Sequence, residues 1–355
     1  MVYEKNTQHS ADGPKVDAVG QEDRVHRPSV LHFLPVPLSA QFSEKNYFIW
    51  CGSMVRDSEG TCHLFYSRWP RETGFNAWVT HSEVARACAI SPLGPYVHRD
   101  IALPARGREF WDGMCTHNPT VLVHEGKYYL YYMGNSGDRR PADTPDSWNW
   151  THRNNQRIGV AVADHPNGPW LRADVPLIDV SSDPNASDSL MVSNPTVTKR
   201  SEGGFLMIYK AVGMKCELPF GGPVVHRVAF SERPDGPFIK QPNPVFSVKD
   251  SKFPAEDPFV WNQNGLYYAV LKDMHGAFTN TGRSLVLFES ENEQNWTLSD
   301  PALVSDRTVV FEDGSVKKFD YLERPQIYFE EGVPRVLFCA GRDEDRTFNI
   351  HIPLA

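Results

Sequence analysis

The sequence predicts an all-β fold, a five-bladed β-propeller in which each blade has four antiparallel strands. From Val30 onward, short apolar and aromatic runs alternate with clusters of Gly, Pro, Asn and Asp, as expected for many short strands. Long helical patterns are nearly absent. Two short motifs also recur along the chain at intervals of about 60–80 residues, and repeats of this kind indicate a propeller.

The first motif is a turn. It combines the end of a strand, a Pro/Gly turn, and an aromatic residue that opens the next strand. It occurs as the sequences SPLGPY, HPNGPW and RPDGPF at residues 91–96, 165–170 and 233–238, with a looser copy at residues 288–296.

The second motif opens a strand. Two polar residues and a proline, which together we call a proline step, precede an apolar strand, a glycine turn and an aromatic-rich strand. Four copies with the proline begin at residues 117, 193, 256 and 323, and a fifth copy without it begins at Trp50. Five copies, each worth about four strands, predict five blades. A β-sandwich with accidental similarity among its turns is the alternative.

The domain organisation follows from these repeats. We expect residues 1–28 to form a polar N-terminal extension and residues 29–355 to form the propeller. Blade five has only three evident strands, at residues 325–329, 335–340 and 348–352. Residues 30–36 are expected to supply its fourth strand, because closing the ring removes exposed sheet edges.

Composition excludes several classes of protein. A net charge of −8 argues against a nucleic-acid-binding protein, which needs a basic face. No apolar run approaches the roughly 20 residues that span a bilayer, so we expect no membrane partner. Residues 1–10 are polar and give no signal peptide, which leaves a cytoplasmic or periplasmic location; the oligomeric state stays open. The six cysteines form no Cys-x-x-Cys pair, so we expect buried, reduced thiols and no zinc site.

The candidate site follows from propeller geometry. The innermost strand of a blade begins at the mouth of the central channel, and the second strand, antiparallel to it, ends there. Side chains at these positions therefore converge on one funnel. The innermost strands bring Ser53, His117, Asn118, Ser193, Asn194, Glu256, Asp257, Glu323 and Arg324. The second strands bring Arg68, Trp69, Asn135, Lys210, Lys272, Asp273 and Arg342, and Trp111 and Asp112 lie just before blade two.

Several carboxylates around one funnel suit glycoside hydrolysis. One carboxylic acid protonates the leaving oxygen, and an ionised carboxylate activates water or attacks the anomeric carbon. A third carboxylate raises the pKa of the acid by like-charge repulsion. Trp50, Trp69 and Trp111 are candidates for stacking on sugar rings, and they suit the blade core equally.

These repeats and steps resemble the five-bladed propeller glycoside hydrolases of families 43, 32, 62 and 117, over about residues 30–355, with a layout closest to families 43 and 117. The resemblance implies three acidic residues from successive blades. Matched by order, Asp112 is the base, Asp257 the pKa modulator and Glu323 the acid. Families 43 and 32 carry their base at the start of blade one, where this chain has Gly52-Ser53. In family 117 a histidine is the acid, and His275 is the counterpart by residue type, with a structural or substrate-contacting role as its alternative.

The resemblance further implies an exo-acting, inverting hydrolase of O-glycosidic bonds, with an oligosaccharide from a plant or algal polysaccharide as substrate. It implies no cofactor, although some relatives hold a structural calcium ion in the channel. The substrate-binding candidates are Trp111, His117, Asn118, Asn194, Glu256, Arg324, Arg68, Trp69, Lys210, Lys272 and Arg342.

The cations among these candidates suggest an anionic sugar, unless they pair with neighbouring carboxylates; an anhydro sugar is the other expected substrate. The alternatives to hydrolysis are a glycoside phosphorylase or transglycosylase on the same fold, and a non-catalytic carbohydrate-binding propeller.

Overall fold

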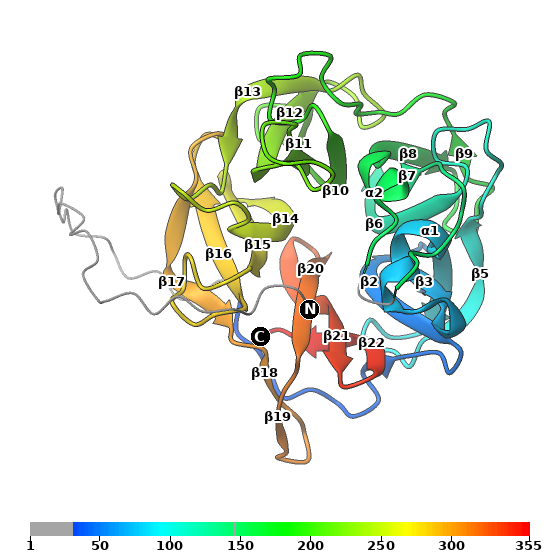
Figure 1. Ribbon diagram of the computed structural model, residues 1–355. Helices are drawn as coiled ribbons and strands as arrows, with labels where there is room; N and C mark the ends of the chain where they lie inside the picture. The colour runs from blue at the N-terminus through cyan, green and yellow to red at the C-terminus, as the bar shows by residue number, and fades with distance from the viewer. Residues whose placement is uncertain (1–30, 145–146) are drawn as a thin grey trace, which may run out of the picture.

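The computed structural model describes residues 31–144 and 147–355. Figure 1 shows five four-stranded antiparallel sheets arranged side by side around a central axis, in the order in which the chain visits them. This arrangement confirms the predicted five-bladed β-propeller. The extension expected at residues 1–28 lies outside the described residues. No helix in the described segments is long and apolar enough to cross a membrane.

Each blade runs from an innermost to an outermost strand. Blade one contains β2 (Tyr47–Arg56), β3 (Cys62–Pro70), β4 (Glu83–Ala89) and β5 (Val97–Leu103). Blade two contains β6 (Cys115–His124), β7 (Lys127–Asn135), β8 (Arg157–Ala163) and β9 (Leu171–Arg172). Blade three contains β10 (Met191–Lys199), β11 (Phe205–Val212), β12 (Val224–Ser231) and β13 (Ile239–Val245). Blade four contains β14 (Ala255–Gln263), β15 (Leu266–Asp273), β16 (Ser284–Ser290) and β17 (Thr297–Ser305).

Blade five is closed by the N-terminal part of the chain. Its strands are β20 (Tyr321–Glu330), β21 (Val333–Asp343), β22 (Arg346–Pro353) and β1 (Gln41–Phe42). The outermost strand was expected at residues 30–36, and that position is wrong: within the described part of this segment, Phe33 and Val36 form only isolated bridges to Leu354 and Phe311. The principle of closure is confirmed, because β1 pairs antiparallel with β22.

Both sequence motifs have the predicted structural roles. The strand-opening motif lies in the innermost strands β2, β6, β10, β14 and β20. The Pro/Gly turn joins the third strand of a blade to the fourth, between β4 and β5, β8 and β9, β12 and β13, and β16 and β17. A short hairpin of β18 (Thr308–Val310) and β19 (Val316–Lys318) connects blade four to blade five.

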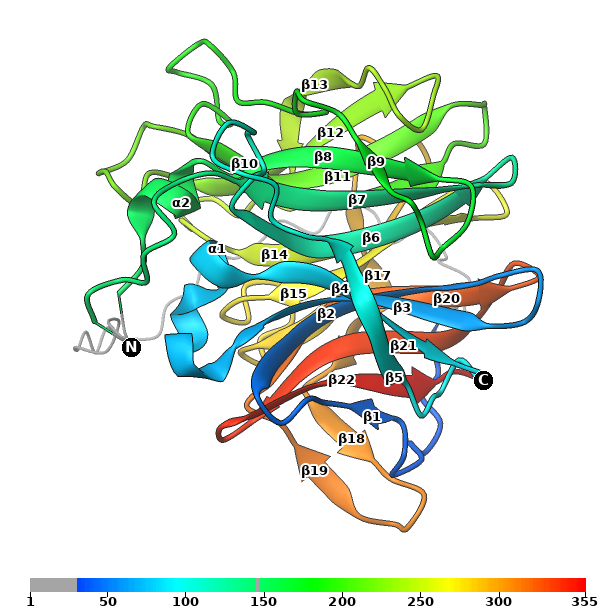
Figure 2. The same ribbon diagram turned by 90° about the vertical axis from the view of Figure 1, so that its right-hand side faces the viewer.

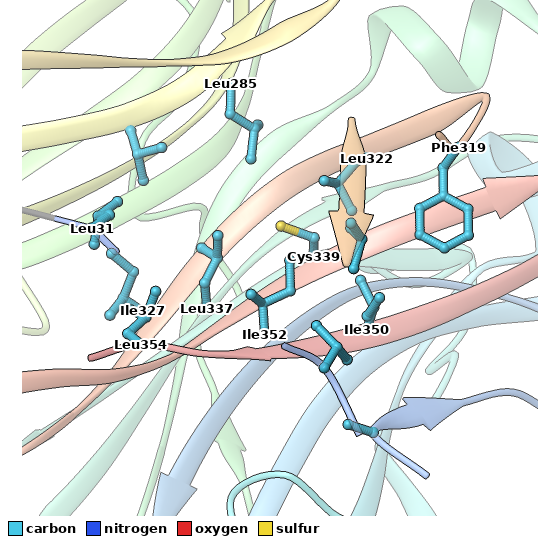
Figure 3. Close-up of a cluster of buried hydrophobic side chains, with 14 of the residues drawn as sticks. Leu31, Leu285, Phe319, Leu322, Ile327, Leu337, Cys339, Ile350, Ile352 and Leu354 are labelled. Atoms are coloured by element: carbon cyan, nitrogen blue, oxygen red, sulfur yellow. The ribbon is translucent and has the colours of Figure 1, made fainter. Parts of the chain in front are cut away.

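Apolar residues from adjacent blades pack against each other to form the core. Figure 3 shows one such cluster, in which Leu285 of β16 joins residues from β20, β21 and β22 and from both ends of the described chain, namely Leu322, Ile327, Leu337, Cys339, Ile350, Ile352, Leu354 and Leu31. Each aliphatic side chain buried in this way contributes about 1.5–3 kcal/mol. All six cysteines are free thiols and five of them are buried, as expected.

The connections between the second and third strands all lie at one end of the propeller, which we call the mouth. In blade one this connection holds two 3₁₀ turns (Arg71–Thr73 and Phe75–Ala77) and α1 (Trp78–His81), and in blade two it holds α2 (Trp150–Asn154). Figure 2 shows α1 and α2 at the same end of the molecule. These connections differ in length and sequence between blades, from a two-residue turn between β21 and β22 to longer loops, so they give each sector of the mouth its own chemistry.

Candidate active site

Five equivalent residues form a ring around the channel, one from the innermost strand of each blade. They are Cys51, Asn118, Asn194, Asp257 and Arg324, and all have positive φ angles of 50–59°. Each lies at a break in the pairing register between the innermost and second strands, which is the signature of a β-bulge. Left-handed backbone at non-glycine residues is uncommon, and five matched copies around an axis indicate a constraint imposed by the site.

The side chains of this ring bond to one another in sequence. The Cys51 thiol donates to Asn118 Oδ1 (2.7 Å), and Asn118 Nδ2 donates to Asn194 Oδ1 (2.5 Å). Asn194 Nδ2 and Arg324 Nη1 both donate to Asp257 Oδ1, at 2.6 and 3.3 Å. The charge of Arg324 also acts on the Cys51 thiol, so the last member of the ring lies next to the first. All five residues are buried.

Asp257 is the only carboxyl group of this ring. Burial raises the pKa of Asp257 to about 7, and the negative charge of Glu256 adds to the effect, while Arg324 opposes it. A carboxyl group in this environment carries a proton over much of the acidic range. The protonation of Asp257 also depends on the charges of Glu256 and Glu323, which lie closer to the mouth.

The residues that directly precede the ring form a second layer, closer to the mouth. In blades four and five they are Glu256 and Glu323, and the ammonium group of Lys272 forms ion pairs with both carboxylates. Lys210 Nζ contacts the other oxygen of Glu256 at 2.7 Å. The result is a chain of alternating charge, in the order Lys210, Glu256, Lys272 and Glu323, which we call the charge chain; Glu256 is partly exposed and the other three are buried.

The charge chain fixes the ionisation of its central carboxylate. Burial on its own raises the pKa of Glu256, but the two lysine ammonium groups outweigh it and hold the pKa at about 2. The charges of Glu323 and Glu256 also raise the pKa of Lys272 despite its burial. Glu256 is thus a permanently ionised carboxylate at the mouth of the channel.

His117 occupies the second layer in blade two. Its Nδ1 hydrogen-bonds the Ser82 hydroxyl at 2.7 Å, and its ring stacks on Trp78 at a centroid distance of 4.8 Å. Burial lowers the pKa of His117 well below its usual value, and the charges of Arg324 and Lys210 lower it further. The imidazole is therefore neutral, which suits a hydrogen-bonding role rather than that of an acid.

Aromatic side chains line the mouth on the side of blades one, two and five. Trp50 meets Phe75 and Tyr321 edge to face. On the other side of His117, Trp78 meets Trp148, and Trp148 stacks on Trp150. Trp50 was among the candidates from the sequence, and the other aromatic residues of this group were not. They lie in the mouth connections or, in the case of Tyr321, just before the strand-opening motif.

The structure does not bring Asp112 to the mouth, and its expected position in the funnel is wrong. Asp112 is fully buried, and its carboxylate accepts hydrogen bonds from Arg106 (2.6 Å), Tyr132 (2.6 Å) and Arg172 of the outermost strand β9 (3.4 Å). Its neighbour Trp111 stacks on Tyr132 and donates to the carbonyl of Ala173. Both residues serve the packing of blade two.

We expect Asp112→Asn to lower stability rather than the chemical rate. Removing the charge leaves Arg172 without this counter-ion and Arg106 with the exposed Asp174 alone, which costs about 3–5 kcal/mol. Urea denaturation measures this loss, and the rate per folded molecule should equal that of the unmutated protein. A rate loss of orders of magnitude with unchanged stability would return Asp112 to the catalytic site.

Four of the five cations expected to bind an anionic sugar are already paired. Lys210, Lys272 and Arg324 bond to carboxylates of the ring and the charge chain. Arg68 pairs with Glu44 and Glu83. Arg342 has no carboxylate partner in the described residues, and its guanidinium lies over Phe75 (4.7 Å) and Tyr321 (5.7 Å). Most of these cations are therefore paired with carboxylates of the protein itself, which was the alternative to binding an anionic sugar.

Three further candidates lie at the mouth. His275 is exposed on the connection after β15, and the buried Asp273 accepts hydrogen bonds from the backbone N–H groups of residues 275–279, which fixes that loop. Trp69 packs beside His117 at a centroid distance of 5.8 Å. Asn135 joins the two mouth helices by bonding the carbonyl of Val79 and the ring of His152.

The oxygen atoms of the channel do not suit a calcium ion. Calcium takes six to eight oxygen ligands, whereas Asn118 Oδ1, Asn194 Oδ1 and Asp257 Oδ1 each accept a hydrogen bond from a neighbour. Arg324 also places a positive charge in the same ring. Within the described residues, no three His, Cys, Asp or Glu side chains cluster as metal ligands.

A separate cavity of about 640 Å³ lies between β1, the β18–β19 hairpin and residues 343–346, and none of the mouth residues described above lines it.

The raised pKa of Asp257 predicts a pH-dependent stability. Its folded-state pKa of about 7 exceeds the ordinary value of 3.8, so the stabilising contribution is complete at low pH and is lost as the pH rises toward 7. The loss is on the order of a few kcal/mol. Asp257→Asn should remove this component, so its unfolding free energy should fall less between pH 4 and pH 7. Equal slopes for the two proteins would contradict the prediction.

Comparison with known proteins identifies the architecture. No protein-family model matches the sequence, and no curated protein matches it. Among solved structures, a glycoside hydrolase superposes with a TM-score of 0.66 at 17% identity, covering 92% of this chain and 91% of that one. Zg3597, a family 117 glycoside hydrolase of the marine bacterium Zobellia galactanivorans, gives a TM-score of 0.60 at 15% identity, with 91% and 88% coverage. The Bacillus subtilis arabinanase Arb43A gives 0.56 at 12% identity, with 88% and 95% coverage. This chain has their fold.

Proposed function

We propose that this protein is a glycoside hydrolase whose active site is the mouth of the propeller. The observation that carries the proposal is the pair Glu256 and Glu323, two carboxylates at equivalent positions of adjacent blades, both in contact with Lys272. Hydrolysis of a glycosidic bond requires two such groups flanking the scissile bond. Two solved structures that share this fold over 91% and 92% of the chain are named as glycoside hydrolases.

Glu256 takes the role of base that the sequence assigned to Asp112. Its low pKa keeps it ionised, and it is the more exposed of the two glutamates. An ionised carboxylate at this position accepts a proton from the attacking water. Lys210 and Lys272 hold it in place through both of its oxygens.

Glu323 takes the role of proton donor, with Asp257 as modulator. The two carboxyl groups interact, because the charge of Glu323 contributes to the raised pKa of Asp257. An inverting reaction follows if water occupies the space between Glu256 and the sugar while Glu323 protonates the leaving oxygen. His275 is the second candidate for the donor, because its side chain is exposed on a loop that Asp273 fixes.

The aromatic mouth suits a carbohydrate substrate. Trp78 and Tyr321 are partly exposed and offer apolar ring surfaces next to the charge chain, and sugar rings stack on such surfaces. We propose an exo-acting enzyme on oligosaccharides derived from plant or algal polysaccharides. Relatives of the same fold include arabinanases, by their names enzymes of arabinan.

An activity screen tests the proposal. The protein is incubated with neutral, uronate-containing, sulfated and anhydro-sugar oligosaccharides, and NMR follows the anomeric configuration of the released sugar. We expect release of one terminal sugar with inverted configuration and no dependence on phosphate. Release only in the presence of phosphate, as a sugar phosphate, would replace hydrolysis by phosphorolysis. Binding without any cleavage would make the protein a carbohydrate-binding propeller.

A further inference from the structure

Arg153 is a buried cation at the mouth that has no carboxylate partner in residues 31–144 and 147–355. It lies on α2 in the connection between β7 and β8, and only 5% of it is exposed. Its Nη1 donates to the Asn154 side-chain oxygen (2.9 Å) and to the carbonyl of Phe220 (2.7 Å). Both acceptors are neutral. Among residues 31–144 and 147–355, Nε and Nη2 have no hydrogen-bond partner, and unlike those of Arg324 they are not sealed from solvent.

A charge in this position is expensive for the folded protein. Burial lowers the pKa of Arg153 to about 10, and the distant charge of Glu256 only partly offsets the effect. Buried guanidinium groups in proteins are normally paired, because an unpaired buried charge loses its hydration and gains no ionic interaction to offset that loss. Lys210, Lys272 and Arg324 follow that rule, and Arg153 does not.

The surroundings of Arg153 have the form of a binding site. The guanidinium lies over the ring of Phe220 at 5.0 Å and that of Trp150 at 5.8 Å. Trp150 stacks on Trp148, which meets Trp78, and Trp78 stacks on His117 of the second layer. A continuous aromatic wall therefore leads from Arg153 to the residues beside the charge chain.

We propose that Arg153, together with Trp150 and Phe220, forms a subsite for a sugar unit that carries a negatively charged substituent, either the carboxylate of a uronic acid or a sulfate ester. The planar guanidinium offers two free donor atoms to such an oxyanion. The aromatic rings supply the apolar surface for the sugar itself. The inference rests on the proposed function for its placement next to a cleavage site, but it concerns binding and not the chemical step.

Binding measurements on the intact chain test the subsite. The probes are galacturonate, glucuronate and galactose 6-sulfate, with galactose and glucose as neutral counterparts, titrated calorimetrically at constant ionic strength. We expect at least one anionic probe to bind about tenfold more tightly than its neutral counterpart. The carboxylate and sulfate arms distinguish the two sources of charge. Equal binding of neutral and anionic probes, or no binding of any probe, would overturn the proposal.

Two substitutions separate recognition from structure. Arg153→Gln should abolish the preference for the anionic probe, while Arg153→Lys should keep part of it. The exposed Arg233→Gln, which lies outside the mouth, is the matched control and should behave like the unmutated protein. Without ligand, Arg153→Gln should unfold at the same temperature or higher, since it removes an unpaired buried charge. A large drop in that temperature, together with an unchanged preference in Arg153→Lys and Arg153→Gln, would make Arg153 structural.

Failure of this inference is distinguishable from failure of the proposed function. A protein that cleaves neutral oligosaccharides and shows no anion preference would keep the function and lose the subsite. A protein that binds uronates or sulfated sugars through Arg153 and cleaves none of them would keep the subsite and lose the function.

Discussion

Glu323→Gln is expected to lower the turnover of a cleavable glycoside by about a thousandfold. Glutamine keeps the shape of the side chain and removes the carboxyl group that is proposed to protonate the leaving oxygen and that contacts Lys272. The effect should fall on kcat, because sugar binding depends mainly on the aromatic mouth. Single-turnover kinetics measure it most directly, with the unfolding temperature recorded alongside.

Glu330→Gln provides the matched control for this experiment. Glu330 lies on the same strand, β20, at the end away from the mouth, and forms an exposed ion pair with Arg56. Its substitution should change neither the rate nor, by more than about 1 kcal/mol, the stability. Equal rates for Glu323→Gln and Glu330→Gln would remove Glu323 from the mechanism. In that case a rate loss in His275→Asn would transfer the role of donor to His275.

Lys272→Met is expected to have the largest combined effect. The substitution leaves Glu323 without its ammonium partner and Glu256 with Lys210 alone, in a buried setting. Breaking a buried pair in this way costs about 3–5 kcal/mol. A stranded charge exists only while the carboxyl group is ionised, so the loss should be small at low pH and grow as the pH rises. Urea denaturation at several pH values measures it.

Two comparisons make this test specific. Lys317→Met breaks an exposed pair with Asp343 and should cost less than about 1 kcal/mol at every pH. The double variant Lys272→Met/Glu323→Gln should recover part of the lost stability, because it also removes the stranded charge. A loss that is independent of pH, or that the second substitution leaves unchanged, would show that Lys272 stabilises the fold by packing rather than by charge.

The fold and the charge chain were predictable because they repeat. The proline steps mark equivalent positions in four blades, so the sequence places Glu256 and Glu323 at one level, and Asp257 and Arg324 at the next, without any knowledge of side-chain contacts. The position of Lys272 was predictable as well, because it lies opposite Glu256 on the antiparallel second strand of the blade. The residues of blade one were harder to align, because glycine replaces proline: the ring residue is Cys51, and Ser53 lies one level below and accepts a bond from the backbone of Val121.

The rest of the site was not predictable from the sequence because it does not repeat. Arg153, Trp148 and Phe220 lie in mouth connections whose lengths differ between blades. Asp112 shows the converse problem: its position just before β6 suggested the funnel, but its partners Arg106 and Arg172 direct its side chain into the blade. Arg172 is 60 residues away in sequence, so only the tertiary structure reveals the pair.

The ring of Cys51, Asn118, Asn194, Asp257 and Arg324 has a kinetic consequence. Because its side chains bond to one another and all five are buried, the ring closes the channel behind the mouth within the described residues. A sugar released at the mouth must leave along the path by which the next chain end arrives. Product and substrate therefore compete for one passage, and the released sugar should act as a competitive inhibitor of its own formation.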